Sequence, residues 1–458
     1  MNRAAATAIV LSVVLSALDL SAVALALPAI TRDLGLAASE GIWIVNASGI
    51  ACAAFLLPAA ILGERVGYRR IYLAGAALVT LASAAAAAST SLPPLLMARV
   101  AQGVGFAGML SVNSALLRIT WPAERLGQGI ALNSMAIAAT SVAAPLLTGV
   151  ALAQGAWQWV FIAVIPVAVL LLASGWQGLP HNPVRSAPTQ LTVGAVLLNA
   201  GMFVLLFAGA DFLRASVRAP EGSGGRFVQG ICLLGLSGAL AWVYLRRQAR
   251  LERPLFPVDL LGIPVFRLSM ITSLCAFAAQ MIAMVGLPFL LLADRGLQAW
   301  QAGLILACWP LAVIPSAYAA ARLSRRVPDG LVSAAGLVHL ALSLMLLALL
   351  PPTAAAWAVM GCLVLCGVGF GLFQSPNNHV IVTSAPLARA GAAGGMLGTA
   401  RLVGQSAGAL LLAFVFEVAG GAMGPAVNLA LGLAAGLAAL AAAVSAARTS
   451  PGVRKGGR

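Results

Sequence analysis

The chain is a succession of long apolar segments, and the short gaps between them carry positive charge mainly on one side of the series. Of its 27 lysine and arginine residues, twenty fall in alternate gaps or at the chain ends. Five fall in the intervening gaps, and two, Arg99 and Arg401, lie inside apolar segments. Positive residues concentrate in the cytoplasmic loops of membrane proteins. The pattern therefore predicts an oriented, multi-pass membrane protein with both termini in the cytoplasm.

Composition supports lipid as the solvent. The chain is 61% hydrophobic and only 9% charged, with a mean hydropathy of +0.99, whereas soluble domains carry roughly 25% charged residues. A helix needs about 20 apolar residues to cross a bilayer, and about fourteen segments of that length follow one another. They are too long for barrel strands, so we expect an all-α fold in which each segment satisfies its own backbone hydrogen bonds.

Several function classes are excluded by what the sequence lacks. The net charge of +15 is dispersed over many loops rather than gathered on one face, which argues against nucleic-acid binding. No phosphate-binding Gly-x-x-x-x-Gly-Lys-Ser/Thr motif occurs, so no ATP-driven chemistry is expected. The six cysteines lie in apolar stretches without metal-type spacing, and three histidines leave little room for a catalytic triad. We expect neither an enzyme nor a metal or organic cofactor.

The longer gaps divide the chain. They lie near 179–190, 213–226 and 247–266, and the first and last of them bracket two helices. We therefore expect a six-helix bundle over 1–180, two inserted transmembrane helices over 181–262, a second six-helix bundle over 263–448 and a cytoplasmic tail over 449–458. The basic residues at the end of the chain, from Arg448 on, are expected to act as topology charges.

An internal repeat agrees with this division. A basic turn follows the second expected helix at 62–70, and another follows the second helix of the last six at 322–330. Matched basic turns at the same ordinal place are typical of transporters built from repeated bundles.

The first of these turns has a recognisable order. It reads Ala60-x-Leu62-x-Glu64-Arg65-x-Gly67-x-Arg69-Arg70 and resembles the signature loop between the second and third helices of the major facilitator superfamily. The resemblance implies a cytoplasmic gate, in which a carboxylate and guanidinium groups form a latch between helix ends that breaks and re-forms during transport. The expected gate residues are Glu64, Arg65, Gly67, Arg69 and Arg70.

Two ionisable residues lie inside expected spans. Arg99 begins the motif Arg99-x-x-Gln102-Gly103-x-Gly105, which resembles the fourth-helix motif of the same superfamily. Asp19 lies in Leu18-Asp19-x-x-x-Val23-x-Leu25-Ala26-Leu27-Pro28, which resembles the first-helix signature of fourteen-span drug:proton antiporters. Charges inside a membrane are costly and usually functional. We predict that Asp19 carries a proton and Arg99 tunes it; the alternative is a purely structural ion pair.

Small residues in two helices suggest close packing. Gln102, Gly103 and Gly105 continue the fourth-helix motif, and Pro145 and Gly149 match part of the antiporter signature in the fifth helix. Such residues allow helices to approach closely or bend.

The longest stretch that resembles a known family lies in the last six helices. It extends from Gly367 to Gln405 and is similar to bacterial fourteen-span drug exporters. Gln374, Asn377 and Asn378 either face a substrate cavity or cap a helix end. Gln280 is a further candidate for the cavity, or a packing residue between helices, and Trp309 is expected in the cavity wall. Arg401 is expected to anchor its helix through an ion pair or carbonyl contacts.

The resemblance covers nearly the whole chain and implies a major facilitator fold with two six-helix bundles, two linker helices and a central cavity. It implies proton-coupled export of small lipophilic compounds by alternating access, from a bacterial cytoplasmic membrane. The partners would be a small-molecule substrate, protons and the bilayer, with the proton gradient as energy source. The alternatives are a dedicated exporter of one metabolite or lipid, and a transport-inactive receptor or scaffold.

Overall fold

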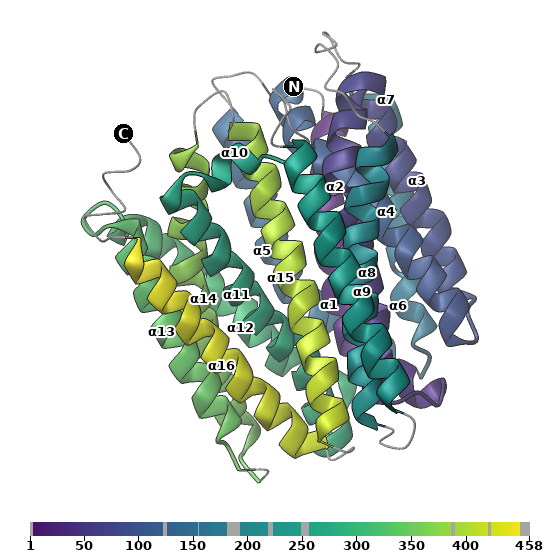
Figure 1. The fold of residues 1–458 in the computed structure, drawn as a ribbon, viewed down its shortest axis with the longest axis vertical. Coiled ribbons are helices and arrows are strands. Elements are labelled where there is room, and N and C mark those ends of the chain that lie inside the picture. The colour runs from purple at the N-terminus through teal and green to yellow at the C-terminus, as the bar shows by residue number, and fades with distance from the viewer. Residues whose placement is uncertain are drawn as a thin grey trace. The chain divides into compact units, whose positions relative to one another are not determined.

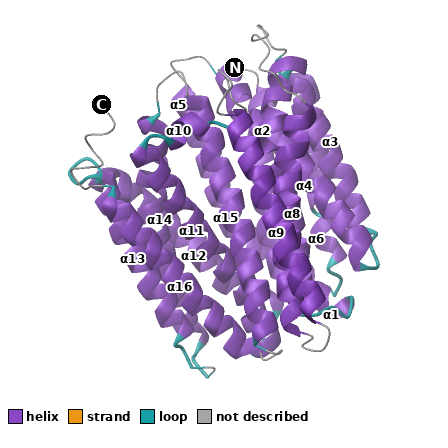
Figure 2. Cartoon of the chain, in the orientation of Figure 1, coloured by secondary structure: helices purple, strands orange, loops and turns teal. Residues whose placement is uncertain are grey.

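A computed structural model describes residues 3–121, 126–153, 155–180, 193–218, 223–248, 256–351, 353–385, 390–419 and 423–448. Throughout these residues the regular structure is helical, as Figure 2 shows. The expected tail, 449–458, lies outside the described residues.

The chain forms two compact units, one of Met1–Ala210 and Val228–Leu255 and the other of Asp211–Phe227 and Phe256–Arg458. The helices up to the middle of the chain are α1 (Arg3–Asp33), α2 (Ala38–Val66), α3 (Tyr68–Ala87), α4 (Leu92–Thr120), α5 (Leu126–Ala153), α6 (Gln158–Ile162), α7 (Val164–Gly178), α8 (Val193–Arg218) and α9 (Ser223–Gln248). The predicted domain boundaries at 180 and 262 stay predictions.

The later helices are α10 (Val258–Leu261), α11 (Pro264–Pro288), the π-helix η2 (Phe289–Asp294), α12 (Ala299–Leu323), α13 (Asp329–Ala348), α14 (Ala356–Ser384), α15 (Ala390–Val418) and α16 (Met423–Ala447). Among the described residues, 14 stretches are long and apolar enough to cross a membrane. Two of them combine neighbouring elements, α6 with α7 and α11 with η2. The all-α, fourteen-span prediction is confirmed.

The two units repeat one packing scheme. In the first unit α4 packs against α2 and α3, while α1 packs against α5 and α7. In the second unit α14 packs against α12 and α13, while α11 packs against α15 and α16. Figure 1 shows α13 and the yellow α16 side by side in the second unit. The repeat expected from the two basic turns is therefore present in the helix packing.

The repeat extends to single residues. Gly35 and Gly296 follow the first span of each unit, and both have φ of 63°, a left-handed conformation that favours glycine. The same bond then begins the next helix in each case, since Glu40 accepts from the Ala37 amide and Gln301 from the Gln298 amide. A Cβ on Gly103 would meet the carbonyl oxygen of Ser48, and one on Gly367 that of Trp309. These pairs set the correspondence between the units.

A buried asparagine attaches the inserted helix α8 to α2. Pro58 lies inside α2 and has no N–H, so it cannot bond the carbonyl oxygen of Ala54 one turn earlier. The Asn199 side-chain amide donates to that oxygen instead. In lipid an unsatisfied carbonyl is expensive, and this bond provides the partner that the helix itself lacks.

Candidate functional site

An ion pair buried in the first unit forms the core of the candidate site. Arg99 Nη1 lies 2.8 Å and 2.9 Å from Asp19 Oδ1 and Oδ2, and the two residues are 1% and 3% exposed. Asp19 is in α1 and Arg99 is in α4, both within apolar spans. The structure thus brings together the two residues that the sequence predicts to act together.

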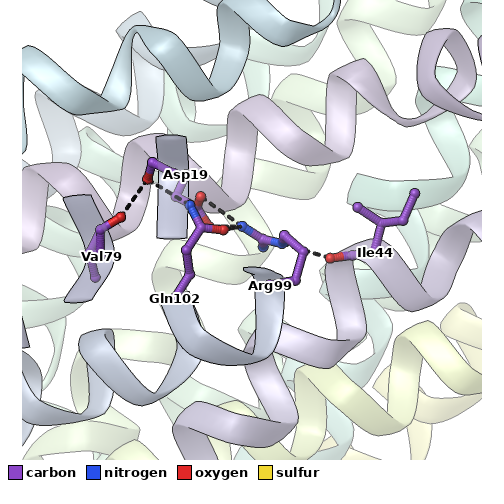
Figure 3. A network of polar contacts seen from close by, with 6 residues as sticks. Asp19, Ile44, Val79, Arg99 and Gln102 are labelled. Carbon is purple, nitrogen blue, oxygen red and sulfur yellow. Dashed lines mark hydrogen bonds and ion pairs between the residues drawn. The ribbon is translucent and has the colours of Figure 1, made fainter. Parts of the chain in front are cut away.

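The guanidinium of Arg99 is held by two further groups, which Figure 3 shows with the hydrogen bonds that continue from them. Its Nε donates to the carbonyl oxygen of Ile44 at 2.7 Å, and Nη1 donates to Gln102 Oε1 at 2.6 Å. Gln102 Nε2 donates to Ser83 Oγ at 2.8 Å, and that hydroxyl donates to the Val79 carbonyl at 2.8 Å. Every side chain in this series of hydrogen bonds has a partner, so Arg99 is fixed in place.

Glycines in α4 allow this network to form. A Cβ on Gly103 would clash with the Ser48 carbonyl oxygen, and one on Gly105 would lie 2.7 Å from that of Gly75. Only glycine lets α4 approach α2 and α3 so closely, which brings Arg99 within reach of Ile44. In α5, which packs on α1, the predicted Pro145 and Gly149 are both buried.

This arrangement has a defined proton chemistry. A carboxylate in an apolar environment is stable only while it is paired, or after it has bound a proton and become neutral. Asp19 has its pairing partner in Arg99 at 2.8 Å. The carboxylate therefore depends on Arg99 for its compensation, while Gln102 and Ile44 hold Arg99 in place.

The predicted gate residues cluster at the other end of the unit, at the turn between α2 and α3. Gly67 has φ of 116°, which explains why glycine occupies the turn. The Arg69 guanidinium donates to the carbonyl oxygen of Trp176 and lies 5.8 Å from the centre of its ring, so it ties α3 to the end of α7. Glu64 and Arg65 are half-buried, and Arg70 is exposed. A gating role for this turn stays a prediction.

The cavity residues predicted in the second unit lie in different environments. Gln280, Gln374 and Asn378 are partly exposed. Trp309 is 1% exposed and packs 6.2 Å from the ring of Phe370. Its predicted place in a cavity wall stays a prediction.

Asn377 differs from one of its two predicted roles. It lies within α14, is fully buried and donates from Nδ2 to Ser273 Oγ at 2.7 Å. It does not cap a helix, because it lies well inside α14. Arg401 is exposed, and its guanidinium carbon lies 5.5 Å from the centre of the Phe277 ring. Its described contact is thus with an aromatic face rather than a carboxylate or carbonyl.

Arg448 is the residue that sequence reasoning missed. Expected as a topology charge, it is only 4% exposed. Its Nη1 donates to Ser269 Oγ at 2.7 Å and to Asn377 Oδ1 at 2.8 Å, and its Nε donates to the Ser445 carbonyl at 3.3 Å. It therefore joins α11, α14 and the end of α16. Burial lowers the pKa of Arg448 to about 10, and the negative charge of Asp329 opposes that shift.

The charged pair has no counterpart in the second unit. Counted back from Gly35 and Gly296, Asp19 corresponds to Gln280. One helical turn before Gly103 and Gly367, Arg99 corresponds to Leu363, which is fully buried. The repeated scaffold thus carries an acid and a base in one unit, and an amide and a hydrocarbon in the other.

The described residues contain no group of three or more His, Cys, Asp or Glu side chains placed to hold a metal ion.

Comparison with known proteins gives a family match over most of the chain. Residues 9–409 match the family model described as Major Facilitator Superfamily. YebQ of Escherichia coli strain K12, described as an uncharacterized transporter, is 41% identical over 418 residues, which are 90% of this chain and 88% of that protein.

More distant relatives have assigned activities. The multidrug efflux pump LfrA of Mycolicibacterium smegmatis is 28% identical over 89% of this chain and 79% of its own length. The riboflavin transporter RibZ of Clostridioides difficile is 26% identical over 86% and 83%. A crystal structure of a peptide transporter, POT, in complex with sulfate superposes with a TM-score of 0.74 over 99% of this chain and 95% of that chain. At 16% identity it shows the common fold alone.

Proposed function

Because the chain belongs to the major facilitator superfamily, we propose that this multi-pass secondary transporter exports small lipophilic or amphipathic compounds in exchange for protons. The observation that carries the proposal is the Asp19–Arg99 ion pair, buried at 2.8 Å within apolar spans. Ionisable groups in membrane spans are functional by default and mark ion pathways. Asp19 is proposed to bind the proton, and Arg99 to favour its release.

The proposed cycle needs only the groups at this site. A proton from outside converts the Asp19 carboxylate to a neutral carboxylic acid and ends the ion pair with Arg99. Release of that proton to the cytoplasm restores the pair. Substrate moves in the opposite direction because the protonated and the ion-paired form of Asp19 favour conformations that open to opposite sides of the membrane, as alternating access requires.

The substrate class follows from chemistry and from relatives. Few charges lie in the spans, and the residue corresponding to Asp19 in the second unit is the neutral Gln280. We expect neutral compounds and monocations to be preferred over dications. Relatives named for drug efflux and for export of tetracenomycin C support the outward direction. The proposed location is a bacterial cytoplasmic membrane with both termini inside.

The test is dye transport by purified protein in proteoliposomes, driven by an imposed pH gradient, with several chemically unrelated dyes. Wild type is expected to accumulate dye only with the gradient, whereas Asp19→Asn is expected to lose accumulation. Asp294→Asn is the matched control, since it makes the same change at an exposed carboxylate. Equal accumulation by wild type and Asp19→Asn would remove the proton role of Asp19, and absence of transport for every dye would contradict polyspecific export.

A second candidate, transport of a single metabolite, is favoured by the riboflavin transporter among the relatives. The dye panel separates the two. A single-metabolite transporter moves none of several unrelated dyes, whereas the proposed exporter moves more than one.

A further inference from the structure

An aromatic pair covers the Asp19–Arg99 ion pair at one end of the first unit. The guanidinium carbon of Arg99 lies 5.9 Å from the centre of the Phe161 ring. The ring is thus a further neighbour of the guanidinium, in addition to the hydrogen-bond partners of Nε and Nη1. Phe161 is fully buried, and its ring lies within the distance at which an aromatic face attracts a cation.

Trp157 holds Phe161 in place. The two rings lie 6.0 Å apart and meet edge to face, at 87°. Trp157 is 4% exposed, and its indole Nε1 donates to Asp33 Oδ2 at 2.7 Å. Asp33 is the last residue of α1, the helix that carries Asp19. One helix thus supplies both the proposed proton acceptor and the hydrogen-bond partner that fixes its cover.

The pair lies at the start of the sixth span. Phe161 lies in α6, a five-residue helix that Ala163 separates from α7, and Gly155, with φ of 93°, lies just before it. α6 packs against α1, α3 and α5 of the same unit. Ala163 itself has helical φ and ψ of −63° and −25°, so α6 continues into α7 and the two form one membrane-spanning stretch, with Phe161 in its first turn.

The positions of the helix ends show on which side of Arg99 the aromatic pair lies. Asp33 ends α1 and Leu92 begins α4 at the end of the unit opposite the basic turn of Arg65, Arg69 and Arg70. Because basic loops face the cytoplasm, the end with Asp33 and Trp157 faces outward. The aromatic pair therefore lies between Arg99 and the outside.

We propose that Trp157 and Phe161 form an outer seal of the proton site, which must move for a proton to reach Asp19 from outside. The inference rests on the proposed function, because it assumes that Asp19 exchanges protons. While Asp19 is open to the cytoplasm, the seal prevents protons from crossing the membrane without substrate. Phe161 is a positioning residue here: it controls access and exchanges no proton itself.

The test is proton leak in proteoliposomes without any substrate. Collapse of an imposed pH gradient is followed with an internal pH dye, with the membrane potential clamped by potassium and valinomycin. Phe161→Ala is expected to accelerate the collapse several-fold over wild type. Trp157→Phe keeps the ring and loses the bond to Asp33, so a smaller acceleration is expected. Trp159→Ala is the matched control, since this neighbouring aromatic of α6 is 48% exposed.

A second substitution shows whether the leak passes through the site. Adding Asp19→Asn to Phe161→Ala is expected to return the leak to the wild-type rate. A leak that persists in the double variant would overturn the proposal. So would a Phe161→Ala variant in which the pH gradient collapses at the wild-type rate. Phe161→Leu, which keeps apolar volume but loses the ring face, replaces Phe161→Ala if the latter does not purify as a monodisperse protein, and the same outcomes apply.

The two proposals fail separately. If wild type and Asp19→Asn accumulate dye alike, proton-coupled export through Asp19 is wrong, whatever the leak. If Asp19→Asn abolishes accumulation but Phe161→Ala neither leaks nor shifts the pH dependence of dye transport, only the seal is wrong.

Discussion

At the scale of single residues, two buried arginines serve different purposes. Arg99 faces a carboxylate at 2.8 Å and can lose its ionic partner to a proton. Arg448 instead bonds neutral oxygens of Ser269, Asn377 and Ser445. Its pKa of about 10 is lowered by burial, yet it lies well above neutral pH, so Arg448 stays charged under ordinary conditions. We therefore interpret Arg448 as a structural residue that holds α11, α14 and α16 of the second unit together, and we call this role the clasp.

Replacing Arg448 by Ala is expected to destabilise the protein. The substitution leaves the buried Asn377 Oδ1 without its donor, and an unsatisfied buried polar group costs about 1–3 kcal/mol. A lower thermal unfolding temperature in detergent would show the loss. Arg247→Ala, at an exposed arginine, is the control and is expected to leave that temperature unchanged. Equal temperatures for Arg448→Ala and wild type would contradict the clasp.

At the scale of elements, the two units solve one packing problem in two ways. Ser333 precedes Gly336 in α13 as Tyr72 precedes Gly75 in α3. In the first unit the Tyr72 hydroxyl fills the helix junction and donates to the Ala8 carbonyl. In the second unit Ser333 donates to the carbonyl oxygen of Phe373, and Arg448 is the residue that donates to the first span of the unit, at Ser269.

Close helix contact in the second unit depends on Gly367. A Cβ there would meet the Trp309 carbonyl oxygen and the side chain of Ala312, so Gly367→Ala forces α14 away from α12. Overpacking of this kind costs about 1–3 kcal/mol. A lower unfolding temperature is expected, whereas Gly361→Ala in the same helix, where nothing lies within 4 Å, is expected to be neutral or stabilising. The same temperature for both variants would show that the helix contact tolerates a methyl group.

At the scale of the whole molecule, the sequence predicts the fourteen spans because each is long, apolar and separated by short gaps. It also predicts the Asp19–Arg99 site, because a charge inside a span has few alternatives. It does not predict that Trp309 packs against Phe370 in the interior, because both the lipid-facing and the core-facing sides of such helices are apolar and periodicity does not reveal direction. Arg448 is missed because a basic residue at a helix end looks like a topology charge until Ser269 and Asn377, distant in sequence, are seen beside it.

The two units of the molecule differ in the charges that they carry. Two units share a scaffold, but Asp19 and Arg99 in the first correspond to Gln280 and Leu363 in the second. The first unit is therefore expected to carry the proton, and the second to contribute neutral contacts. The proposed outer seal of Trp157 and Phe161 belongs to the first unit alone, because Phe161 lies beside Arg99 and the second unit has Leu363 at the corresponding position.

The measurement that tests this account most directly is proton movement driven by a dye. Proteoliposomes loaded with a transported dye, without an imposed pH gradient, release it down its own gradient while an internal pH dye records protons. Wild type is expected to move protons against the flow of dye, and Asp19→Asn is expected to move none, even where it still releases dye. Proton movement by Asp19→Asn equal to that of wild type would contradict the assignment of the proton to Asp19.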